Sequence, residues 1–321
     1  MSESFVGVDV GGTKVAVARL DGDGLSEPQV TPTDTGSAEA LVDQLAQVIA
    51  PAAADGAAAV GIGIPSAVEF ATGRALSGVN VPLENVPLRA RLTERLGLPV
   101  FVDNDANVAA LAEACDETGN LVVNNLVMFT VGTGVGGGLV INGRPFRGAT
   151  GAGTEMGHVI IGLDLTDGAP PPAPRFPQPG SLEALAAGRA LDRLAGEAAR
   201  AHPDSALGRL AAAGETVTGR QAVAAAQEGD EHALRALTVL GERLGIGIAS
   251  AINVFDPEQV VVGGGVIAAG DLLLGPARET AWRYVLPGVG SRTEIRAARY
   301  GNDAGVRGAA LLAAKESVIG G

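Results

Sequence analysis

The feature that most constrains this chain is a cluster of glycines between two apolar runs. In residues 126–141, a run rich in β-branched side chains gives way to Gly132-Thr-Gly-Val-Gly-Gly-Gly138, and an apolar run then resumes. This order predicts strand, turn, strand. Glycines place no Cβ atoms in the way, so the backbone N–H groups of such a turn can close around a phosphate. The alternative interpretation is a tight hairpin that uses glycine for its positive φ angles.

The same design occurs at the N-terminal end, where residues 5–18 contain Gly11-Gly12 between two apolar runs. A third glycine turn, Gly263-Gly-Gly265, lies in residues 254–266 after an apolar run that we predict to be a strand. The first two units lie about 120 residues apart, and each leads into alternating helices and strands. We therefore expect a duplicated α/β protein with a cleft between the copies, in which the phosphate loops face each other.

Composition narrows the function classes. The chain has 321 residues, 46% of them hydrophobic, which is enough for two domains with substantial cores. A formal charge of −13 opposes binding to nucleic acid or to anionic membranes, and 3% aromatic residues leave little for base stacking. A single cysteine, Cys115, excludes an intrachain disulfide. Without an N-terminal targeting pattern or an apolar run of about 20 residues, a cytoplasmic protein is expected.

The rest of the chain alternates as an α/β sheet requires. Helical spacing over 40–49 precedes a buried strand at 58–64, and a helix at 88–96 precedes a strand at 100–102. Residues 168–180 are too rich in proline for a helix or a central strand and predict a surface loop. Residues 182–200 and 219–252 are predicted to be mostly helical. A last helix, at about 305–317, is expected to pack back onto the N-terminal half.

A polar cluster, Asp103-Asn-Asp-Ala-Asn107, follows the strand at 100–102 directly. Ligands of open α/β sheets bind at the carboxyl ends of strands, so this cluster is a candidate site. The alternative is capping of the helix that the composition of residues 108–114 predicts, since Asp and Asn are good N-caps. Capping accounts for one of these polar residues but not for all of them.

Six motifs resemble those of the ROK family of sugar kinases and repressors, within the actin-like, hexokinase-like ATPase superfamily, and they occur along the chain in the order typical of that family. The resemblance covers nearly the whole chain. The motifs are Asp9-Val-Gly-Gly-Thr-Lys14 and Gly132-Thr-Gly-Val-Gly-Gly-Gly138 for phosphate, Gly61-Ile-Gly-Ile-Pro65 before the sugar pocket, Asn104-Asp-Ala-Asn107 for the catalytic loop, Glu155-Met-Gly-His158 for the sugar, and Gly263-Gly-Gly-Val266 for adenosine.

The resemblance implies a fold of two duplicated actin-like ATPase (ribonuclease H-like) α/β domains with an interdomain cleft. It places a small N-terminal domain at 1–115 plus 303–321 and a large C-terminal domain at 116–302. Asp105 is implied as the general base, and Asp9 as a residue that helps to hold Mg²⁺ through water. Sugar contacts are implied for Asn80, Asn104, Asp105, Glu155, His158 and Glu183. Contacts to ATP are implied for Asp9, Gly11, Gly12, Thr13, Lys14, Thr133, Gly134, Gly136, Gly264 and Gly265.

This chemistry is consistent with the residue types. A sugar hydroxyl is a poor nucleophile, so a carboxylate must orient it and take its proton while metal and backbone donors neutralise the phosphates. For single residues the structural alternatives stay open. Glu183 is also typical of the first turn of a helix, and His158 of a hydrogen-bonded buried histidine. The loop of Asn80 aligns with the family pattern in more than one register.

The chain departs from the family pattern in two places. Where the family has a cysteine motif that binds zinc, this chain has the proline-rich stretch and then Gly180-Ser-Leu-Glu183, without a cysteine. A closed zinc site needs about four N or S ligands, so we expect no structural zinc. Local hydrogen bonds and apolar packing under the proline-rich stretch are expected to hold His158 instead. In addition, Ser66 replaces the usual glycine and Glu69 the usual aspartate, which we expect to adjust a loop.

The resemblance implies ATP- and Mg²⁺-dependent phosphorylation of a hexose at its 6-hydroxyl, with glucose as the expected substrate and a homodimer as the expected assembly. Fructose, mannose, allose and N-acetylmannosamine remain alternative substrates, and polyphosphate an alternative donor. A sugar-sensing repressor is disfavoured because only eight residues precede Asp9, too few for a helix-turn-helix. A nucleotide-driven switch is disfavoured because Asp105, Glu155 and His158 together indicate a sugar site, which a switch would not need. A dinucleotide oxidoreductase is disfavoured because the glycine turn joins two strands.

Overall fold

The computed structural model describes residues 3–319 apart from 23, 55 and 79, and it contains two main sheets. The first has six strands, in the order β3-β2-β1-β5-β8 with β4 paired to β2. Its strands are β1 (Phe5–Val10), β2 (Lys14–Asp21), β3 (Gly24–Leu25), β4 (Gln29–Pro32), β5 (Ala59–Ile64) and β8 (Val100–Asn104). Strands β1 and β2 are antiparallel, whereas β5 runs parallel to both β1 and β8.

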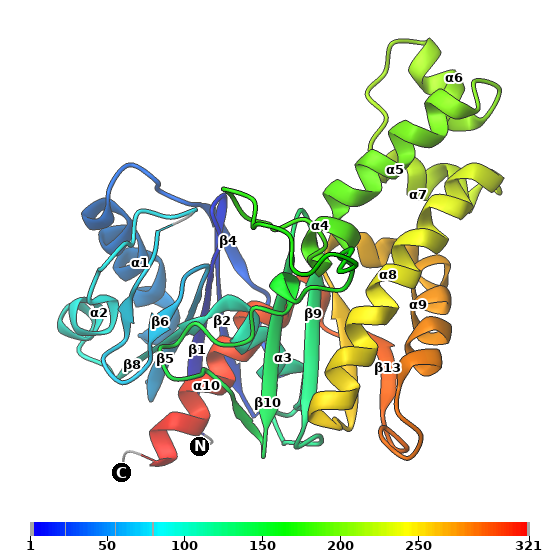
Figure 1. Cartoon of the computed structure of the whole chain (residues 1–321). Coiled ribbons are helices and arrows are strands. Elements are labelled where there is room, and N and C mark those ends of the chain that lie inside the picture. The colour runs from blue at the N-terminus through cyan, green and yellow to red at the C-terminus, as the bar shows by residue number, and fades with distance from the viewer. Residues whose placement is uncertain (1–2, 23, 55, 79, 320–321) are drawn as a thin grey trace. The chain divides into compact units, whose positions relative to one another are not determined.

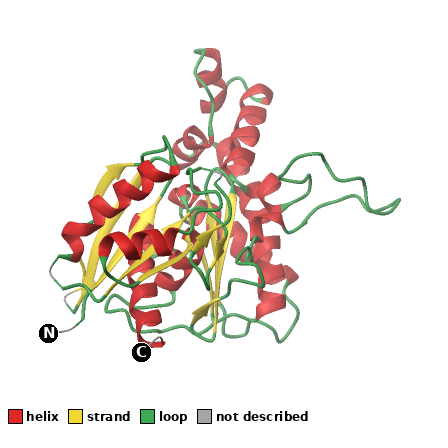
Figure 2. Cartoon of the chain, turned by 90° about the vertical axis from the view of Figure 1, so that its left-hand side faces the viewer, coloured by secondary structure: helices red, strands yellow, loops and turns green. Residues whose placement is uncertain are grey.

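Helices cover both faces of this sheet (Figure 2). On one face, α1 (Ala38–Ala53) and α2 (Leu88–Leu96) bury Leu41, Leu45 and Leu92 against the strand valines. On the other face, α3 (Asp105–Glu113) and α10 (Ala304–Ile319) bury Val108, Leu111 and Leu311. Strand β5 is buried along its whole length and is the nearly continuous apolar run that the sequence predicted, whereas the edge strand β4 is mostly exposed.

Helix α10 lies directly on the strands because glycine stands at the contact points. A Cβ atom at Gly7 in β1 would lie 2.0 Å from the carbonyl oxygen of Val306, and one at Gly61 in β5 would lie 1.8 Å from that of Ala309. Gly308 gives the same close approach to α3, at the carbonyl oxygen of Val108. The prediction that the last helix packs back onto the N-terminal half is confirmed.

The second sheet has the strand order β11-β10-β9-β12-β13 (Figure 1). Its strands are β9 (Leu126–Val131), β10 (Val135–Ile141), β11 (Arg144–Pro145), β12 (Gln259–Gly263) and β13 (Glu294–Ala297); a separate small sheet pairs β6 (Val68–Glu69) with β7 (Arg74–Ala75). The remaining helices are α4 (Leu182–Ala186), α5 (Gly188–Ala201), α6 (Ala206–Ala212), α7 (Gly219–Gln227), α8 (Glu231–Phe255) and α9 (Asp271–Tyr284). Short 3₁₀ turns are η1 (Met156–His158), η2 (Gly265–Ala269) and η3 (Gly301–Asp303).

Three details correct the sequence-based expectations. The apolar run at 254–266 is not one strand, because Val254 and Phe255 complete α8 and Asp256 ends it with a left-handed φ of 43°. Strand β12 starts only at Gln259. The helix after β8 begins at Asp105, where Asn104 is the N-cap. Residues 168–180 form the expected loop without helix or strand.

Helix α8 is the one helix among the described residues that is long and apolar enough to cross a membrane, by length and composition alone. Within its most apolar window, 56% is buried inside the structure. Gly241 and Gly245 bring it against α9, where Cβ atoms would lie 2.5 Å from the carbonyl oxygens of Leu273 and Ala277. This packing is that of a core helix.

The chain divides into two compact units. Unit 1 comprises residues 1–126, 138–154 and 299–321, and unit 2 comprises 127–137 and 155–298. Unit 1 contains β1, a glycine turn and β2, followed by helices and parallel strands. Unit 2 contains most of β9, a glycine turn and the first residues of β10, followed by helices and the parallel strands β12 and β13. The predicted mixed α/β fold is therefore confirmed.

Candidate active site

The first glycine turn, in unit 1, joins β1 to β2. Its shape is fixed by backbone bonds, because the N–H of Gly11 donates to the carbonyl of Lys14 over 2.8 Å and the hydroxyl of Thr33 donates to the carbonyl of Gly11 over 2.7 Å. A Cβ atom at Gly12 would lie 3.1 Å from the Cβ atom of Asn80. The structure therefore brings Asn80 beside this turn, while Thr13 and Lys14 are exposed.

Two carboxylates approach each other next to this turn. Burial, followed by the nearby charge of Asp105, raises the pKa of Asp9 from 3.8 to about 6, and Lys14 opposes the shift. Gly305 makes room for the Asp9 carboxylate, because a Cβ atom there would lie 2.6 Å from the carboxyl carbon. Gly63 makes room for α3, because a Cβ atom there would lie 2.7 Å from Cγ2 of Val108. A divalent cation would relieve this repulsion.

The described residues contain no group of three or more His, Cys, Asp or Glu side chains placed to hold a metal ion. Mg²⁺ nevertheless fits the carboxylate pair, because it binds through one or two carboxylates and takes its other ligands from water and phosphates.

The predicted catalytic loop is built at the junction of β8 and α3. Asn104 caps α3, its side-chain oxygen accepting from the N–H groups of Ala106 and Asn107. One carboxylate oxygen of Asp105 accepts from the N–H of Ala106 over 2.8 Å. Because Asn104 performs the capping, the helix cap does not require a carboxylate at position 105. The capping alternative therefore explains Asn104 and leaves Asp105 for another role.

The sequence did not predict the contacts that support the predicted catalytic loop. Asp103 is 1% exposed, and its Oδ2 accepts from Nε of Arg147 over 2.7 Å while its Oδ1 accepts from the N–H of Asn104 over 2.8 Å. The carbonyl of Ser66 accepts from the Asn104 amide over 3.3 Å, and the Ser66 hydroxyl bonds to Ser77. Ser66 therefore links the segment around Ser77 to the loop of Asn104. Asp103 belonged to the polar cluster, but no signal in the sequence linked it to Arg147.

The second glycine turn, in unit 2, joins β9 to β10. Glycines 132, 134 and 136–138 do not appear among the residues with positive φ, so the interpretation as a hairpin that needs positive φ is wrong. Gly134 instead accommodates a carboxylate, because a Cβ atom there would lie 2.3 Å from Oε2 of Glu183. Nothing lies within 4 Å of a Cβ atom at Gly132, and Thr133 is exposed.

The third glycine turn follows β12 in unit 2. Gly264 has a φ of +89°, and a Cβ atom there would lie 2.4 Å from the carbonyl oxygen of Val131, so only glycine fits. At Gly265, nothing lies within 4 Å of an added Cβ. The end of β12 is therefore held against the end of β9, where the second glycine turn starts.

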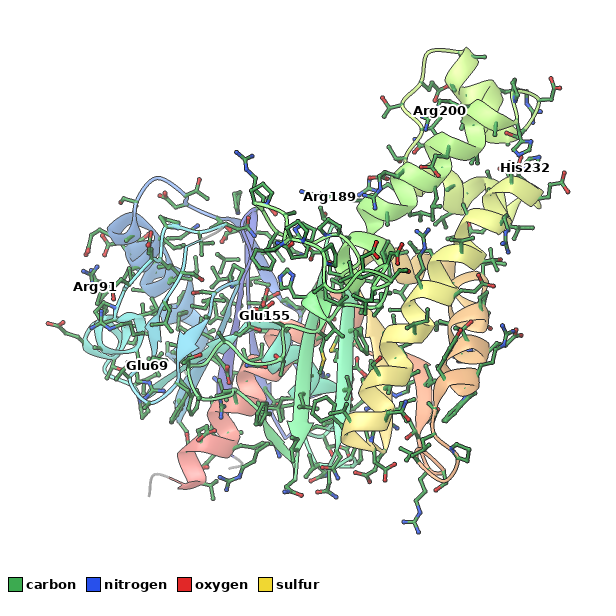
Figure 3. All side chains as sticks on the ribbon, in the orientation of Figure 1. Glu69, Arg91, Glu155, Arg189, Arg200 and His232 are labelled. Carbon is green, nitrogen blue, oxygen red and sulfur yellow. The ribbon has the colours of Figure 1, made fainter. Side chains whose placement is uncertain are left out.

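The Glu-x-Gly-His segment forms the 3₁₀ turn η1. Glu155, labelled in Figure 3, is 65% exposed, and its Oε2 lies 3.8 Å from Nε2 of His158. The Phe176 ring packs edge-on against His158 with ring centroids 5.3 Å apart. Apolar packing under the proline-rich stretch is thus confirmed, but the expected hydrogen bond is not, since the buried Nδ1 of His158 has no partner among the described residues.

The predicted site residues fall into two sets, one in each unit. Unit 1 holds Asp9, Gly11, Gly12, Thr13, Lys14, Asn80, Asn104 and Asp105, and unit 2 holds Thr133, Gly134, Gly136, Glu155, His158, Glu183, Gly264 and Gly265. The mixed α/β fold, with a strand, a glycine turn and a second strand in each of two sheets, is that of the actin-like ATPase class.

Comparison with known proteins narrows this class. The ROK family model matches residues 5–316, and the chain belongs to the ROK family. It is 35% identical over 316 residues to the glucokinase of Halalkalibacterium halodurans, covering 96% of this chain and 94% of that protein. The ROK hexokinase structure from Thermus thermophilus aligns with a TM-score of 0.78 at 35% identity, covering 98% of this chain and 99% of that one.

A second solved structure adds ligands. The ROK family glucokinase from Streptomyces griseus, in complex with glucose and AMPPNP, aligns with a TM-score of 0.75 at 33% identity. The alignment covers 97% of this chain and 99% of that chain.

Proposed function

We propose that this protein is an ATP-dependent hexose kinase that phosphorylates glucose at its 6-hydroxyl. The observation that carries the proposal is the loop after β8, in which Asn104 caps α3 and Asp105 lies close enough to Asp9 to raise its pKa. Full-length similarity to proteins named glucokinases supports glucose as the substrate.

In this mechanism Asp105 accepts a hydrogen bond from the 6-hydroxyl and takes its proton as the oxygen attacks the γ-phosphorus of ATP. The bond from that phosphorus to the bridging oxygen breaks, and ADP leaves. Asn104, Glu155, His158, Glu183 and Asn80 hold the other sugar hydroxyls, for which amide, carboxylate and imidazole groups supply both donors and acceptors. These side chains fix the sugar so that a single hydroxyl is presented.

The glycine turns supply backbone N–H groups to the phosphates, with Thr13, Lys14 and Thr133 exposed beside them. Asp9 would hold Mg²⁺ through water, and the bound ion would neutralise charge on the transferred phosphate. The raised pKa of Asp9 fits this role, because a group whose ionised form is disfavoured by a neighbouring carboxylate gains from a nearby cation.

The test is formation of ADP by purified protein with Mg²⁺-ATP and a panel of glucose, fructose, mannose, allose, N-acetylmannosamine and N-acetylglucosamine. Glucose should give the highest kcat/KM. Higher turnover with another sugar would change the substrate assignment, and turnover with polyphosphate in place of ATP would change the donor. Sugar binding without any ADP would indicate a sensing protein and overturn the enzymatic assignment.

We also propose a homodimer in the cytoplasm. Large apolar side chains are exposed on the last turns of α8 and α9 and just beyond, among them Val254, Trp282, Tyr284 and Leu286. Such side chains are enriched at protein interfaces. Light scattering of the purified protein decides the assembly, and a monomer at micromolar concentration would contradict it.

A further inference from the structure

We propose that Glu183 is a positioning residue for the second glycine turn in addition to its role toward the sugar, and that it couples sugar binding to nucleotide binding. The inference rests on the proposed function, because it takes Glu183 as a sugar contact and the turn at 132–136 as a phosphate contact. It adds a direct physical link between the two ligand sites.

The link begins at the N–H group of Val135, the first residue of β10. Oε2 of Glu183 accepts a hydrogen bond from this N–H over 2.9 Å. A Cβ atom at Gly134 would lie only 2.3 Å from the same oxygen, so any residue other than glycine at that position would displace the carboxylate. The exit of the glycine turn is thus fixed by a charge-assisted hydrogen bond from a side chain 48 residues further along the chain.

The entry of the turn is fixed by the same short segment. Helix α4 contains Glu183 in its first turn and is capped by the hydroxyl of Ser181, which accepts from the N–H of Ala184. Directly after α4, the N–H of Gly188 donates to the carbonyl of Gly132 over 2.8 Å. Residues 183–188 therefore hold both ends of the turn, at Gly132 and at Val135. A shift of α4 would be transmitted to the turn at two points.

A second sugar-contacting segment packs on the same residue of the turn. A Cβ atom at Gly157, in the Glu-x-Gly-His segment, would lie 2.0 Å from the carbonyl oxygen of Val135. Val135 is thus held on its N–H by Glu183 and covered on its carbonyl by Gly157. Glycine is required at 157 by this contact, whatever the sugar.

The chemistry of a carboxylate allows both tasks at once. Within the described part of the chain, the hydrogen bond from Val135 is the one that the Glu183 side chain makes, so its second oxygen is available to accept from a sugar hydroxyl. A sugar bound there would restrain the side chain, and a restrained side chain would hold the turn in one conformation. Nucleotide would then bind to a turn that is already ordered, and linkage requires the reverse effect to be equal.

Two substitutions of Glu183 distinguish the effect of side-chain length from the effect of charge. Glu183→Asp keeps the charge but shortens the side chain by one methylene, so its carboxylate no longer reaches the Val135 N–H. Glu183→Gln removes the charge but keeps the length, and its amide oxygen can still accept that N–H. Both change the group offered to the sugar. Glu155→Gln serves as the matched control, because Glu155 is an assigned sugar contact without a bond to the turn.

The experiment measures the Kd of Mg²⁺-AMPPNP by calorimetry in the absence of sugar, for the wild type and the three variants. Glu183→Asp should weaken AMPPNP binding by about tenfold, the usual effect of losing a hydrogen bond to a charged group, while Glu183→Gln and Glu155→Gln stay within about threefold. With the wild type, saturating glucose should tighten AMPPNP binding, and Glu183→Asp should abolish this effect.

An unchanged AMPPNP Kd in Glu183→Asp, with glucose binding weakened, would overturn the positioning role and leave the proposed function intact. A wild type that binds AMPPNP and not glucose would overturn the substrate assignment, and the coupling with it. If the Glu183→Asp protein does not fold, Gly157→Ala applies the same disturbance from the carbonyl side of Val135. A normal AMPPNP Kd in a folded Gly157→Ala protein would also count against the inference.

Discussion

Replacement of Asp103 by asparagine should destabilise unit 1 although the side chain changes by only one atom type. Asp103 is 1% exposed, and three hydrogen bonds converge on it. Its Oδ1 accepts from the N–H of Asn104 and from the Asn107 amide over 3.0 Å, and its Oδ2 accepts from Arg147 over 2.7 Å. Asparagine has one oxygen, so either Arg147 or the pair of donors would face an NH₂ group.

The size of the effect follows from burial. Removing one partner of a buried ion pair costs about 3–5 kcal/mol, because the other charge stays desolvated. The Arg147 side chain is 17% exposed, lies 3.5 Å from Glu316 and stacks 3.4 Å from the centre of the Phe70 ring, so its charge keeps other partners. We therefore expect a loss near 3 kcal/mol, or about 6–12 °C in the Tm at roughly 2–4 °C per kcal/mol.

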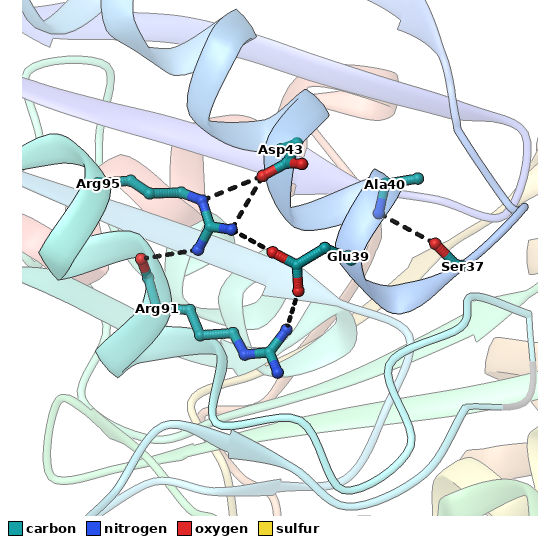
Figure 4. A network of polar contacts seen from close by, with 6 residues as sticks. All are labelled: Ser37, Glu39, Ala40, Asp43, Arg91 and Arg95. Atoms are coloured by element: carbon teal, nitrogen blue, oxygen red, sulfur yellow. Dashed lines mark hydrogen bonds and ion pairs between the residues drawn. The ribbon is translucent and has the colours of Figure 1, made fainter.

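The assay is thermal unfolding of the wild type, Asp103→Asn and a control on the surface. The control is Arg91→Met, in the network of Figure 4, where Arg91 contacts a Glu39 side chain that is 58% exposed. Exposed ion pairs often contribute nothing measurable, so its Tm should match that of the wild type. If Asp103→Asn lowered the Tm no more than the control, the argument from burial would be refuted.

Three further outcomes are expected. Asp105→Asn should lower kcat by about 10²–10⁴-fold with an unchanged Tm, because Asn104 caps α3; a variant that keeps more than about a tenth of wild-type kcat would contradict a general base. In EDTA, the free energy of unfolding should fall as the pH rises through about 6, because the pKa of Asp9 in the folded protein lies above its ordinary value of 3.8. Urea unfolding at several pH values measures this dependence, and Asp9→Asn should flatten it. Metal analysis of the purified protein should find no stoichiometric zinc, and EDTA should stop catalysis while circular dichroism stays unchanged.

The strands and glycine turns were predictable because both signals are local. A strand buried on both faces needs a nearly continuous apolar run; β5 is one, and β1 and β9 are each interrupted by a single polar residue, Asp9 and Thr130. Asn104 and Asp105 were predictable as a candidate site because they follow a strand directly, and position at a strand end is also a local property. The end of α8 could not be predicted, because Val254 and Phe255 suit a strand as well as a helix.

The supports of the site could not be predicted because they join distant parts of the chain. Asp103 and Arg147 are 44 residues apart, and Val135 and Glu183 are 48 apart. No local pattern in the sequence marks either pair as a contact. Their pairing depends on how β8 and the segment after β11 approach each other, or on how α4 meets the turn, and local propensity contains no information on either.

The glycines of these segments differ in what the missing Cβ atom allows. Gly132 and Gly265 have open space where a Cβ would be, which suits turns that leave room for a phosphate. Gly134 and Gly157 instead make room for other parts of the protein, a carboxylate at Gly134 and a carbonyl oxygen at Gly157. The glycines are therefore of two kinds, one that leaves open space at the turn and one that lets supporting residues approach the backbone. Both kinds look alike in a sequence, and only the neighbours in the fold separate them.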